Sequence, residues 1–184
     1  MKEKVIDAAI KEFTKSGLKF KMNDIAKSMG ISKRTIYTVF DSKEAVLEGI
    51  TDKYFADFLV MQKKVTEDKD MDVITKIETI LCALPEKYQN IGLSNLCELS
   101  HKYPTIYKRL MGYVTKGWDL VEQYLEQGMK EQKIRNISIP IVMTMIEGTV
   151  TQFMQNKVLV EHSITYEEAK KEMVKVIING IRYE

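Results

Sequence analysis

The chain has 184 residues, of which 45% are hydrophobic and 29% are charged, and its formal net charge is +2. These are ordinary values for a globular protein with a sizeable core, so composition alone gives no reason to expect a disordered or fibrous chain. The charge is uneven, because residues 1–47 hold ten Lys or Arg against six Asp or Glu, and the other 18 basic residues face 20 acidic ones. A basic N-terminal part ahead of a near-neutral remainder favours contact with a polyanion.

The sequence gives only weak signals for a targeting segment or for cysteine chemistry. The N-terminus alternates charged and apolar residues without the apolar core of a secretory signal, and the most apolar window, 139–146, is far shorter than the roughly 20 residues that span a bilayer. Cys82 and Cys97 form neither a metal-ligand pattern nor a disulfide framework. We therefore expect a cytoplasmic protein with free thiols, no membrane contact and no metal; a redox switch at these cysteines remains an alternative.

The first predicted element is an amphipathic helix over residues 3–16. Val5, Ile6, Ala9 and Phe13 recur at helical spacing, and Gly17 follows as a stop. Such a helix is not stable alone, so we expect it to pack against the segment that follows.

Residues 22–40 read as two short helices joined at Gly30. Apolar residues recur at one-turn spacing in each half, Gly30 suits a left-handed backbone after the first helix, and Ser32 is a good N-cap for the second. A helix, a short turn containing Gly and a second helix make the helix-turn-helix arrangement. With Ile36 and Phe40 turned inward, the second helix presents to the outside Lys33, Arg34, Thr35, Tyr37 and Thr38.

Two cations in the first turn of a helix oppose the helix dipole, unless an anion such as a DNA phosphate docks there. In a DNA-binding helix-turn-helix, the N-terminal residues of the second helix reach base edges. The alternative is an ordinary solvated helical hairpin. The next helix begins after Asp41 or Ser42, either of which can cap it, and continues to about Lys64.

The pattern from residue 5 to residue 50 resembles the TetR/AcrR family of bacterial transcriptional regulators. The resemblance rests on Gly17, Asp24-Ile25-Ala26, Gly30-Ile31-Ser32, Thr35-Ile36-Tyr37, Phe40 and Ser42-Lys43-Glu44. One position departs from the family: Lys21 stands where Thr or Ser usually caps the first helix of the motif, which removes a cap worth about 1 kcal/mol. With the exposed face of the second helix, the predicted DNA-contacting set is Lys21, Met22, Asn23, Lys33, Arg34, Thr35, Tyr37, Thr38 and Lys43.

The rest of the chain predicts a helical body without strands. Helices are expected over 73–84, 91–99, 105–132 and 139–159, and a last helix follows the capping box that begins at Thr165. The fold class is therefore all-α with about nine helices, divided into an N-terminal helix-turn-helix domain, residues 1–47, and a larger effector-binding and dimerisation domain, residues 48–184.

The last two helices are apolar over wide arcs, which a monomer has few helices left to cover. A two-fold interface would complete their burial, and the family resemblance implies a dimer formed by these two helices. Packing within one molecule is the alternative. The predicted dimer residues are Phe153, Met154, Met173, Ile177 and Ile181.

An effector cavity is expected in the middle of the body, because Met, Tyr and Trp recur on inward stripes and flexible thioethers suit an adaptable apolar cavity. Ordinary core packing is equally compatible with each of these residues. Glu98 and Glu147 lie among apolar positions, and a buried carboxylate needs a partner, either a ligand group or an internal basic or hydroxyl side chain. The predicted cavity residues are Glu98, Met111, Tyr113, Trp118, Met143 and Glu147.

Together these patterns predict a homodimeric DNA-binding regulator, a repressor released from a pseudo-palindromic operator by a small apolar or amphipathic effector. The alternative is a helix-turn-helix protein that answers to a protein partner or to no ligand. An enzyme is not expected, because the chain has two histidines and lacks a nucleophile motif, a phosphate loop and a metal-spaced cluster. No cofactor is expected either.

Overall fold

The computed structural model of the protein describes residues 1–83, 88, 93–155 and 158–183. Its first helices are α1 (Lys2–Ser16), a 3-10 turn η1 (Gly17–Lys19), α2 (Met22–Met29), α3 (Lys33–Tyr37) and α4 (Lys43–Glu67). The body continues with α5 (Val73–Cys82), α6 (Leu93–Lys102), α7 (Pro104–Lys116), α8 (Asp119–Lys130), α9 (Ile139–Gln155), α10 (Val158–Glu161) and α11 (Tyr166–Ile181). The all-α prediction is confirmed, and none of the described helices is long and apolar enough to cross a membrane.

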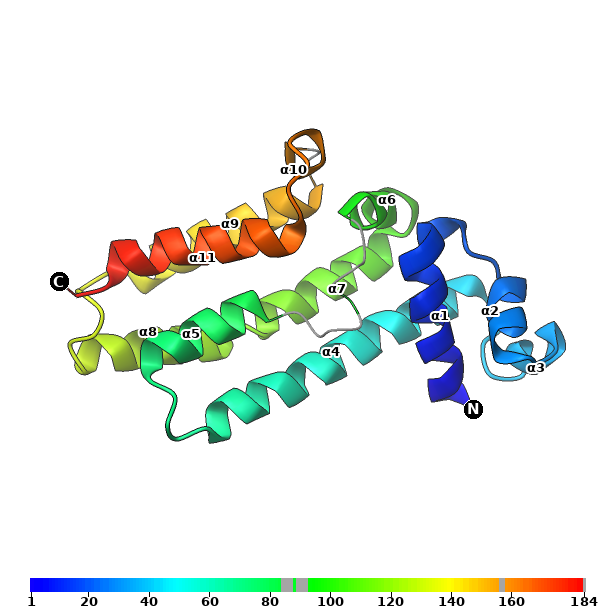
Figure 1. The fold of residues 1–184 in the computed structure, drawn as a ribbon, viewed down its shortest axis with the longest axis horizontal. Helices are drawn as coiled ribbons and strands as arrows, with labels where there is room; N and C mark the ends of the chain where they lie inside the picture. Colours follow the sequence, from blue (N-terminus) through cyan, green and yellow to red (C-terminus); the bar gives the residue numbers. More distant parts are fainter. Residues whose placement is uncertain (84–87, 89–92, 156–157, 184) are drawn as a thin grey trace.

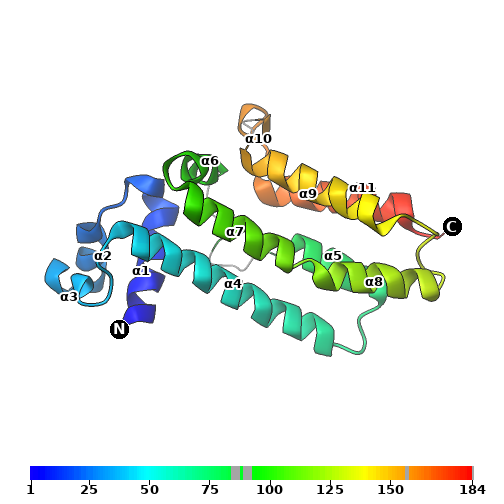
Figure 2. The same cartoon turned by 180° about the vertical axis from the view of Figure 1, so that it is seen from behind.

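The molecule is elongated, with the small N-terminal helices at one end and the C-terminus at the other (Figure 1). Helix α4 leaves the N-terminal end and runs along one side of the body, while α9 and α11 lie side by side on the opposite side. Helices α5, α7 and α8 fill the space between them, as the reverse view also shows (Figure 2). One continuous apolar core extends from Val5 in α1 to Ile178 in α11.

Local signals set most helix ends as expected. The Ser42 hydroxyl, rather than Asp41, accepts the Ala45 N–H at 3.0 Å and so caps α4. Before α11, Thr165 Oγ1 accepts the Glu168 N–H at 3.2 Å and Glu168 Oε2 accepts the Thr165 N–H at 2.9 Å, which is the predicted capping box.

The single helix expected over 105–132 is instead two helices, α7 and α8, that meet at Gly117. The Gly117 carbonyl accepts a hydrogen bond from the buried amide of Gln62 in α4, and a Cβ at Gly117 would collide with the ring of Phe58. The break thus depends on α4, a partner that periodicity along 105–132 does not reveal. The helix expected over 139–159 is described as α9 and α10, and the predicted start of the 91–99 helix lies outside the described residues.

An antiparallel bridge between Ile134 and Arg182 holds the far end of the body together. Arg135 N–H donates to Ile181 O at 2.9 Å and Tyr183 N–H donates to Lys133 O at 3.0 Å, so the turn after α8 is tied to the end of α11. The buried Ile134 side chain lies against Gly128 of α8, where a Cβ would have no room. These contacts orient α11 against the body and thereby position the residues that its inner face carries.

Candidate nucleic-acid interface and effector cavity

The turn between α2 and α3 has the geometry expected of a helix-turn-helix. Gly30 adopts a left-handed conformation with φ 64° and ψ 29°, and Ile31 N–H donates back to Ala26 O at 3.0 Å. Ser32 Oγ then accepts the Thr35 N–H at 3.1 Å and caps α3. Ile36 is fully buried in the core, which fixes the rotation of α3 about its own axis.

That rotation leaves the predicted contact residues of α3 on the outside. Lys33, Arg34 and Thr38 are exposed, Thr35 is half-buried, and Tyr37 is 43% exposed, an unusual level for a large aromatic side chain. The Lys33 ammonium lies 5.5 Å from the centre of the Tyr37 ring. Because α3 has only five residues, its dipole is short, and the anion-attracting character of this surface comes from the two side-chain cations.

Three predicted residues at the start of α2 have different environments. Lys21 and Asn23 are exposed, whereas Met22 is only 6% exposed and packs into the core, so it has no surface to offer to DNA. The missing cap at Lys21 is partly replaced, because Asp24 Oδ2 accepts the Lys21 N–H at 2.8 Å. That bond is the reciprocal half of a capping box.

Lys43 is turned inward, contrary to the expectation that it faces phosphate. Its ammonium donates to the Leu18 carbonyl and lies 4.5 Å from the centre of the Phe20 ring. Partial burial lowers the pKa of Lys43, and the nearby Lys102 acts in the same direction. In this conformation Lys43 fastens the start of α4 to the η1 turn, and contact with DNA would require it to leave both partners.

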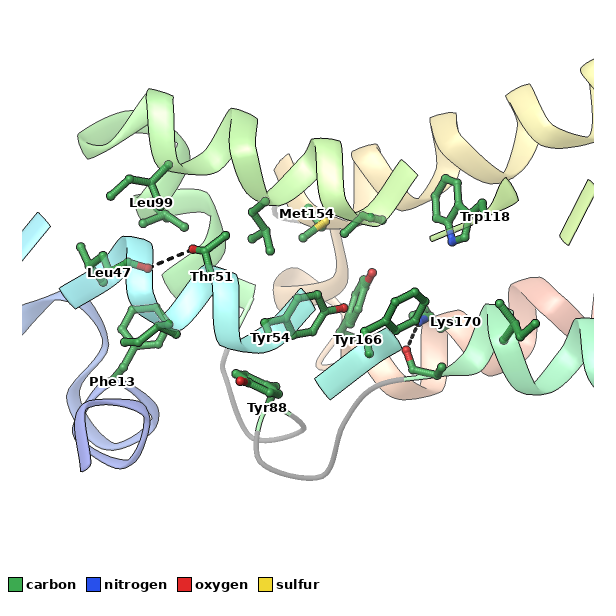
Figure 3. Close-up of a pocket in the computed structure, with 17 residues that line it drawn as sticks. Phe13, Leu47, Thr51, Tyr54, Tyr88, Leu99, Trp118, Met154, Tyr166 and Lys170 are labelled. Carbon is green, nitrogen blue, oxygen red and sulfur yellow. Dashed lines mark hydrogen bonds between the residues drawn. The ribbon is translucent and has the colours of Figure 1, made fainter. Parts of the chain in front are cut away.

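An elongated, mainly apolar cavity lies inside the body, beside α4 (Figure 3). Its open volume is about 90 Å³, and its walls come from α4, α5, α6, α7, α9 and α11, together with Phe13 of α1. Phe13 belongs to the same small helical group as the helix-turn-helix, so one wall of the cavity is built by the N-terminal end. The lining residues on α4 are Leu47, Ile50, Thr51, Tyr54 and Phe58.

Of the six predicted cavity residues, Trp118 alone is among the described lining residues. Met143 is buried elsewhere in the core, and Met111 is half-buried outside the cavity. Glu98 pairs with Lys102 at 2.5 Å, and Tyr113 donates to Asp52 Oδ1 at 2.9 Å on the surface between α7 and α4.

Glu147 is exposed, because the buried stripe of α9 runs through Val142, Ile146 and Val150 and leaves the next position outside. Of the two carboxylates predicted to be buried, Glu98 therefore forms a surface ion pair and Glu147 is solvated.

The cavity contains a polar group that the sequence prediction missed. Lys170 of α11 is 8% exposed, its Nζ donates to Ala83 O at 3.1 Å, and it lies 5.6 Å from the centre of the Tyr166 ring. Burial lowers the pKa of Lys170 to about 8 and raises the pKa of Tyr54 to about 12. A signal was present in the sequence, since Tyr166, Lys170, Val174 and Ile178 recur every four residues and define the inner face of α11.

The predicted dimer residues divide into two groups. Phe153, Met173 and Ile177 are half-buried, but Met154 and Ile181 are buried within the protomer, and Met154 lines the cavity. The apolar groups left exposed on these two helices include Met145 of α9, at 56%, and Val176 of α11, at 63%. Cys82 is a free, half-buried thiol, and the side chain of Cys97 lies outside the described residues.

Comparisons with known proteins agree with this geometry. Residues 5–50 match the family model of the bacterial regulatory proteins, tetR family. The uncharacterized HTH-type transcriptional regulator YvaF of Bacillus subtilis is 25% identical over 181 residues, which cover 98% of this chain and 95% of the relative.

Two solved structures share the fold along nearly the whole chain. A transcriptional regulator from Cytophaga hutchinsonii superposes with a TM-score of 0.74 at 20% identity, covering 98% of this chain and 97% of the other. The regulator FadR from Bacillus subtilis, solved in complex with stearoyl-CoA, superposes with a TM-score of 0.65 at 18% identity, covering 98% and 99%.

A helix-turn-helix with an exposed basic face, mounted on an all-α body, defines the class of helix-turn-helix transcriptional regulators. Residues 5–50 of this chain match the tetR family of that class.

Proposed function

We propose that this protein is a homodimeric repressor that a small apolar or amphipathic effector releases from a pseudo-palindromic operator in the bacterial cytoplasm. In this proposal residues 1–47 bind DNA, and residues 48–184 bind the effector and hold the dimer together. The observation that carries the proposal is the exposed face of α3, where Lys33, Arg34 and Tyr37 stand free of the core while Ile36 locks the helix in place.

The α3 side chains suit a duplex groove. Arg34 offers a planar fork of donors for guanine or phosphate, Tyr37 and Thr38 offer hydroxyl groups, and Lys33 adds a second positive charge. Lys21 and Asn23, exposed at the start of α2, are placed in the proposal on the flanking phosphates. Met22 and Lys43 are left out, since one is buried and the other is engaged within the protein.

Dimerisation is proposed through α9 and α11, with an interface that differs in part from the predicted one. Ile141, Met145 and Gly148 recur at helical spacing on the exposed side of α9, and Val176 and Gly180, with the half-buried Met173, do so on α11. A Cβ at Gly148 or Gly180 would meet nothing within 4 Å, so a partner helix could approach both backbones closely. Two copies would carry two recognition helices, as a pseudo-palindrome requires.

Effector binding and DNA release are coupled in the proposal through the cavity wall. About 90 Å³ is room for a few water molecules, so an effector of ordinary size must separate the lining helices. It therefore binds an expanded state better than the present one, as any ligand that shifts a conformational equilibrium must. Because Phe13 and Leu47 belong to the wall, expansion moves α1 and the start of α4, which support the helix-turn-helix.

A mutational test of DNA contact uses an operator obtained by sequencing the DNA fragments that the purified protein retains. We expect Arg34→Ala and Tyr37→Ala each to weaken operator binding by about tenfold or more, because each removes a contact from the groove. The melting temperature should stay unchanged, since both side chains are outside the core. Lys116→Ala, which removes an exposed cation from the body, is the matched control. Undiminished affinity of both α3 variants in a gel shift would refute the contact assignment.

A further inference from the structure

The inner end of the cavity holds a buried cation with incomplete partners. An ammonium group has three N–H donors. Within the described part of the chain, Lys170 Nζ has one hydrogen-bond acceptor, Ala83 O, and otherwise faces the ring of Tyr166. A backbone carbonyl satisfies one donor but carries no charge, so no hydrogen-bonded partner among the described residues neutralises the positive charge of Lys170.

Two acidic residues of the described chain, Glu167 and Asp57, are engaged by other partners. Glu167, three positions before Lys170 on the same helix, pairs with Lys171 at 2.7 Å on the outside. Asp57 of α4 pairs with Lys53 at 2.7 Å and accepts the Tyr88 hydroxyl at 3.3 Å. Among the described residues that line the cavity there is no Asp or Glu, and Lys170 is the one charged side chain.

The remaining polar groups of the wall can donate to an anion. Tyr54 and Tyr166 lie between Lys170 and the α1 end of the cavity (Figure 3). Burial raises the pKa of both tyrosines, so their hydroxyls stay protonated near neutral pH and remain donors. Thr51, further along, already donates to Leu47 O at 3.0 Å.

The opposite end of the cavity is apolar. Leu47 and Phe58, the first and last lining residues of α4, are eleven positions apart, which at the rise of an α-helix corresponds to about 16 Å of wall. Phe13, Leu47 and Leu99 surround the end away from Lys170 (Figure 3). A ligand that matches this wall is elongated, with one polar head and an apolar body.

We propose that the effector is a monoanionic amphiphile, an organic acid whose carboxylate pairs with Lys170 and whose apolar body lies along α4 toward Phe13. The inference rests on the proposed effector cavity and specifies its ligand class. A carboxylate supplies the charge and the acceptor oxygens that Lys170 lacks, and it can also accept from the neighbouring tyrosine hydroxyls. The lowered pKa of Lys170 agrees with this, since burial disfavours the ammonium form and outweighs the opposing effects of Cys82 and Glu167.

The inference is tested by calorimetric titration of the full-length protein with head-group analogues on one alkyl chain, namely decanoate, decanol and decylamine, below their micelle concentrations. Hexanoate and myristate extend the series in chain length. We expect decanoate to bind about tenfold to a hundredfold more tightly than decanol, the range for a hydrogen bond to a charged partner, and decylamine to bind least. Equal affinities of decanoate and decanol would overturn the proposal, as would failure of all three acids to bind.

Variants separate the head contact from the rest of the cavity. Lys170→Met keeps the unbranched apolar stem and removes the charge, so it should bind decanoate and decanol with similar affinity. Lys171→Met, one residue away and exposed, is the control and should keep the preference for the acid. The head-group comparison on the unchanged chain needs no variant, so it stands even if Lys170→Met folds poorly. Retained preference for decanoate in a folded Lys170→Met chain would overturn the assignment.

The same probes distinguish this inference from the proposed function. If decanol binds as tightly as decanoate and both release operator DNA, the effector cavity is supported and the anionic head is refuted. If decanoate binds through Lys170 without releasing DNA, the ligand class is supported and the coupling between cavity and operator is refuted.

Discussion

At the scale of single residues, three lysines of this chain have three different electrostatic environments. Lys33 is exposed on α3, Lys43 is partly buried against the Leu18 carbonyl and the Phe20 ring, and Lys170 is enclosed beside a cavity. Burial disfavours the charged form, so the pKa is lowered for Lys43 and lowered further, to about 8, for Lys170. An exposed cation is available to a polyanion, whereas an enclosed one selects a ligand with a counter-charge.

The lowered pKa of Lys170 predicts a pH-dependent stability. Between about pH 8 and pH 10.5 the unfolded chain binds more protons than the folded chain, so the free energy of unfolding rises with pH in this window. Below it the folded protein bears the full cost of the buried charge, about 3 kcal/mol. Relative to the unchanged chain, Lys170→Met should therefore be more stable at neutral pH, and the advantage should shrink as pH rises.

Urea unfolding of both chains across this range measures that difference. Among the described residues, the ionisable groups that act on Lys170 are Cys82 of α5 and Glu167 of α11. Tyr54 and Tyr166 also line its cavity, and all four residues are common to both chains. The raised pKa values of the two tyrosines keep them neutral in the window. A stability difference that does not change with pH would show that Lys170 titrates normally.

Single-residue environments were the least predictable part of the sequence. The exposed face of α3 followed from periodicity, because Ile36 leaves only one rotation for a short helix in which Lys33, Arg34 and Tyr37 are outside. Lys43 was not predictable, since its partners Leu18 and Phe20 come from another element. Lys170 stands beside Lys171 in sequence, and only the four-residue spacing from Tyr166 to Ile178 separates the buried lysine from the exposed one.

At the scale of elements, caps and turns were predictable because they depend on neighbours within a few residues. Gly30 has the left-handed conformation and Thr165 forms the capping box that the sequence indicates. The cavity was not predictable, since its wall combines residues from seven helices and the sequence shows only which residues face inward. The prediction of one continuous helix over 105–132 was wrong for the same reason, because Gln62 and Phe58 of α4 impose the break at Gly117.

The break between α7 and α8 yields a prediction with a matched control. Gly117→Ala adds a methyl group against the buried ring of Phe58, and overpacking of this kind should lower the free energy of unfolding by about 1–3 kcal/mol. Gly112→Ala, in α7, meets nothing within 4 Å and should raise stability by up to about 1 kcal/mol through helix propensity. Urea unfolding of the two variants should therefore give changes of opposite sign.

If both substitutions instead stabilised the protein equally, α7 and α8 would tolerate a continuous helix, and the Phe58 ring would have room to move. Because Phe58 also lines the cavity, a destabilised Gly117→Ala chain should in addition bind apolar ligands less tightly, as its displaced ring narrows the space. Gly112, exposed and outside the described lining, should leave ligand binding unchanged.

At the scale of the whole molecule, the proposed operator binding depends on two copies held at a fixed separation. The predicted interface included Met154 and Ile181, which are instead used within one protomer. Exposed apolar groups on α9 and α11, among them Ile141, Met145 and Val176, remain for the proposed partner. A charge introduced into the middle of this face would be buried without a counter-charge in a dimer but fully solvated in a monomer.

Met145→Glu is therefore expected to shift the protein to a monomer in sedimentation analysis while leaving its helical content unchanged. Its operator affinity should fall sharply, because one recognition helix contacts a half-site alone and the second no longer adds its share. Val60→Glu is the matched control, since Val60 is equally exposed but lies on α4, away from α9 and α11. It should remain a dimer with full operator affinity. If Met145→Glu also stayed dimeric, the copies would have to meet elsewhere, and the exposed face of α9 would need another partner.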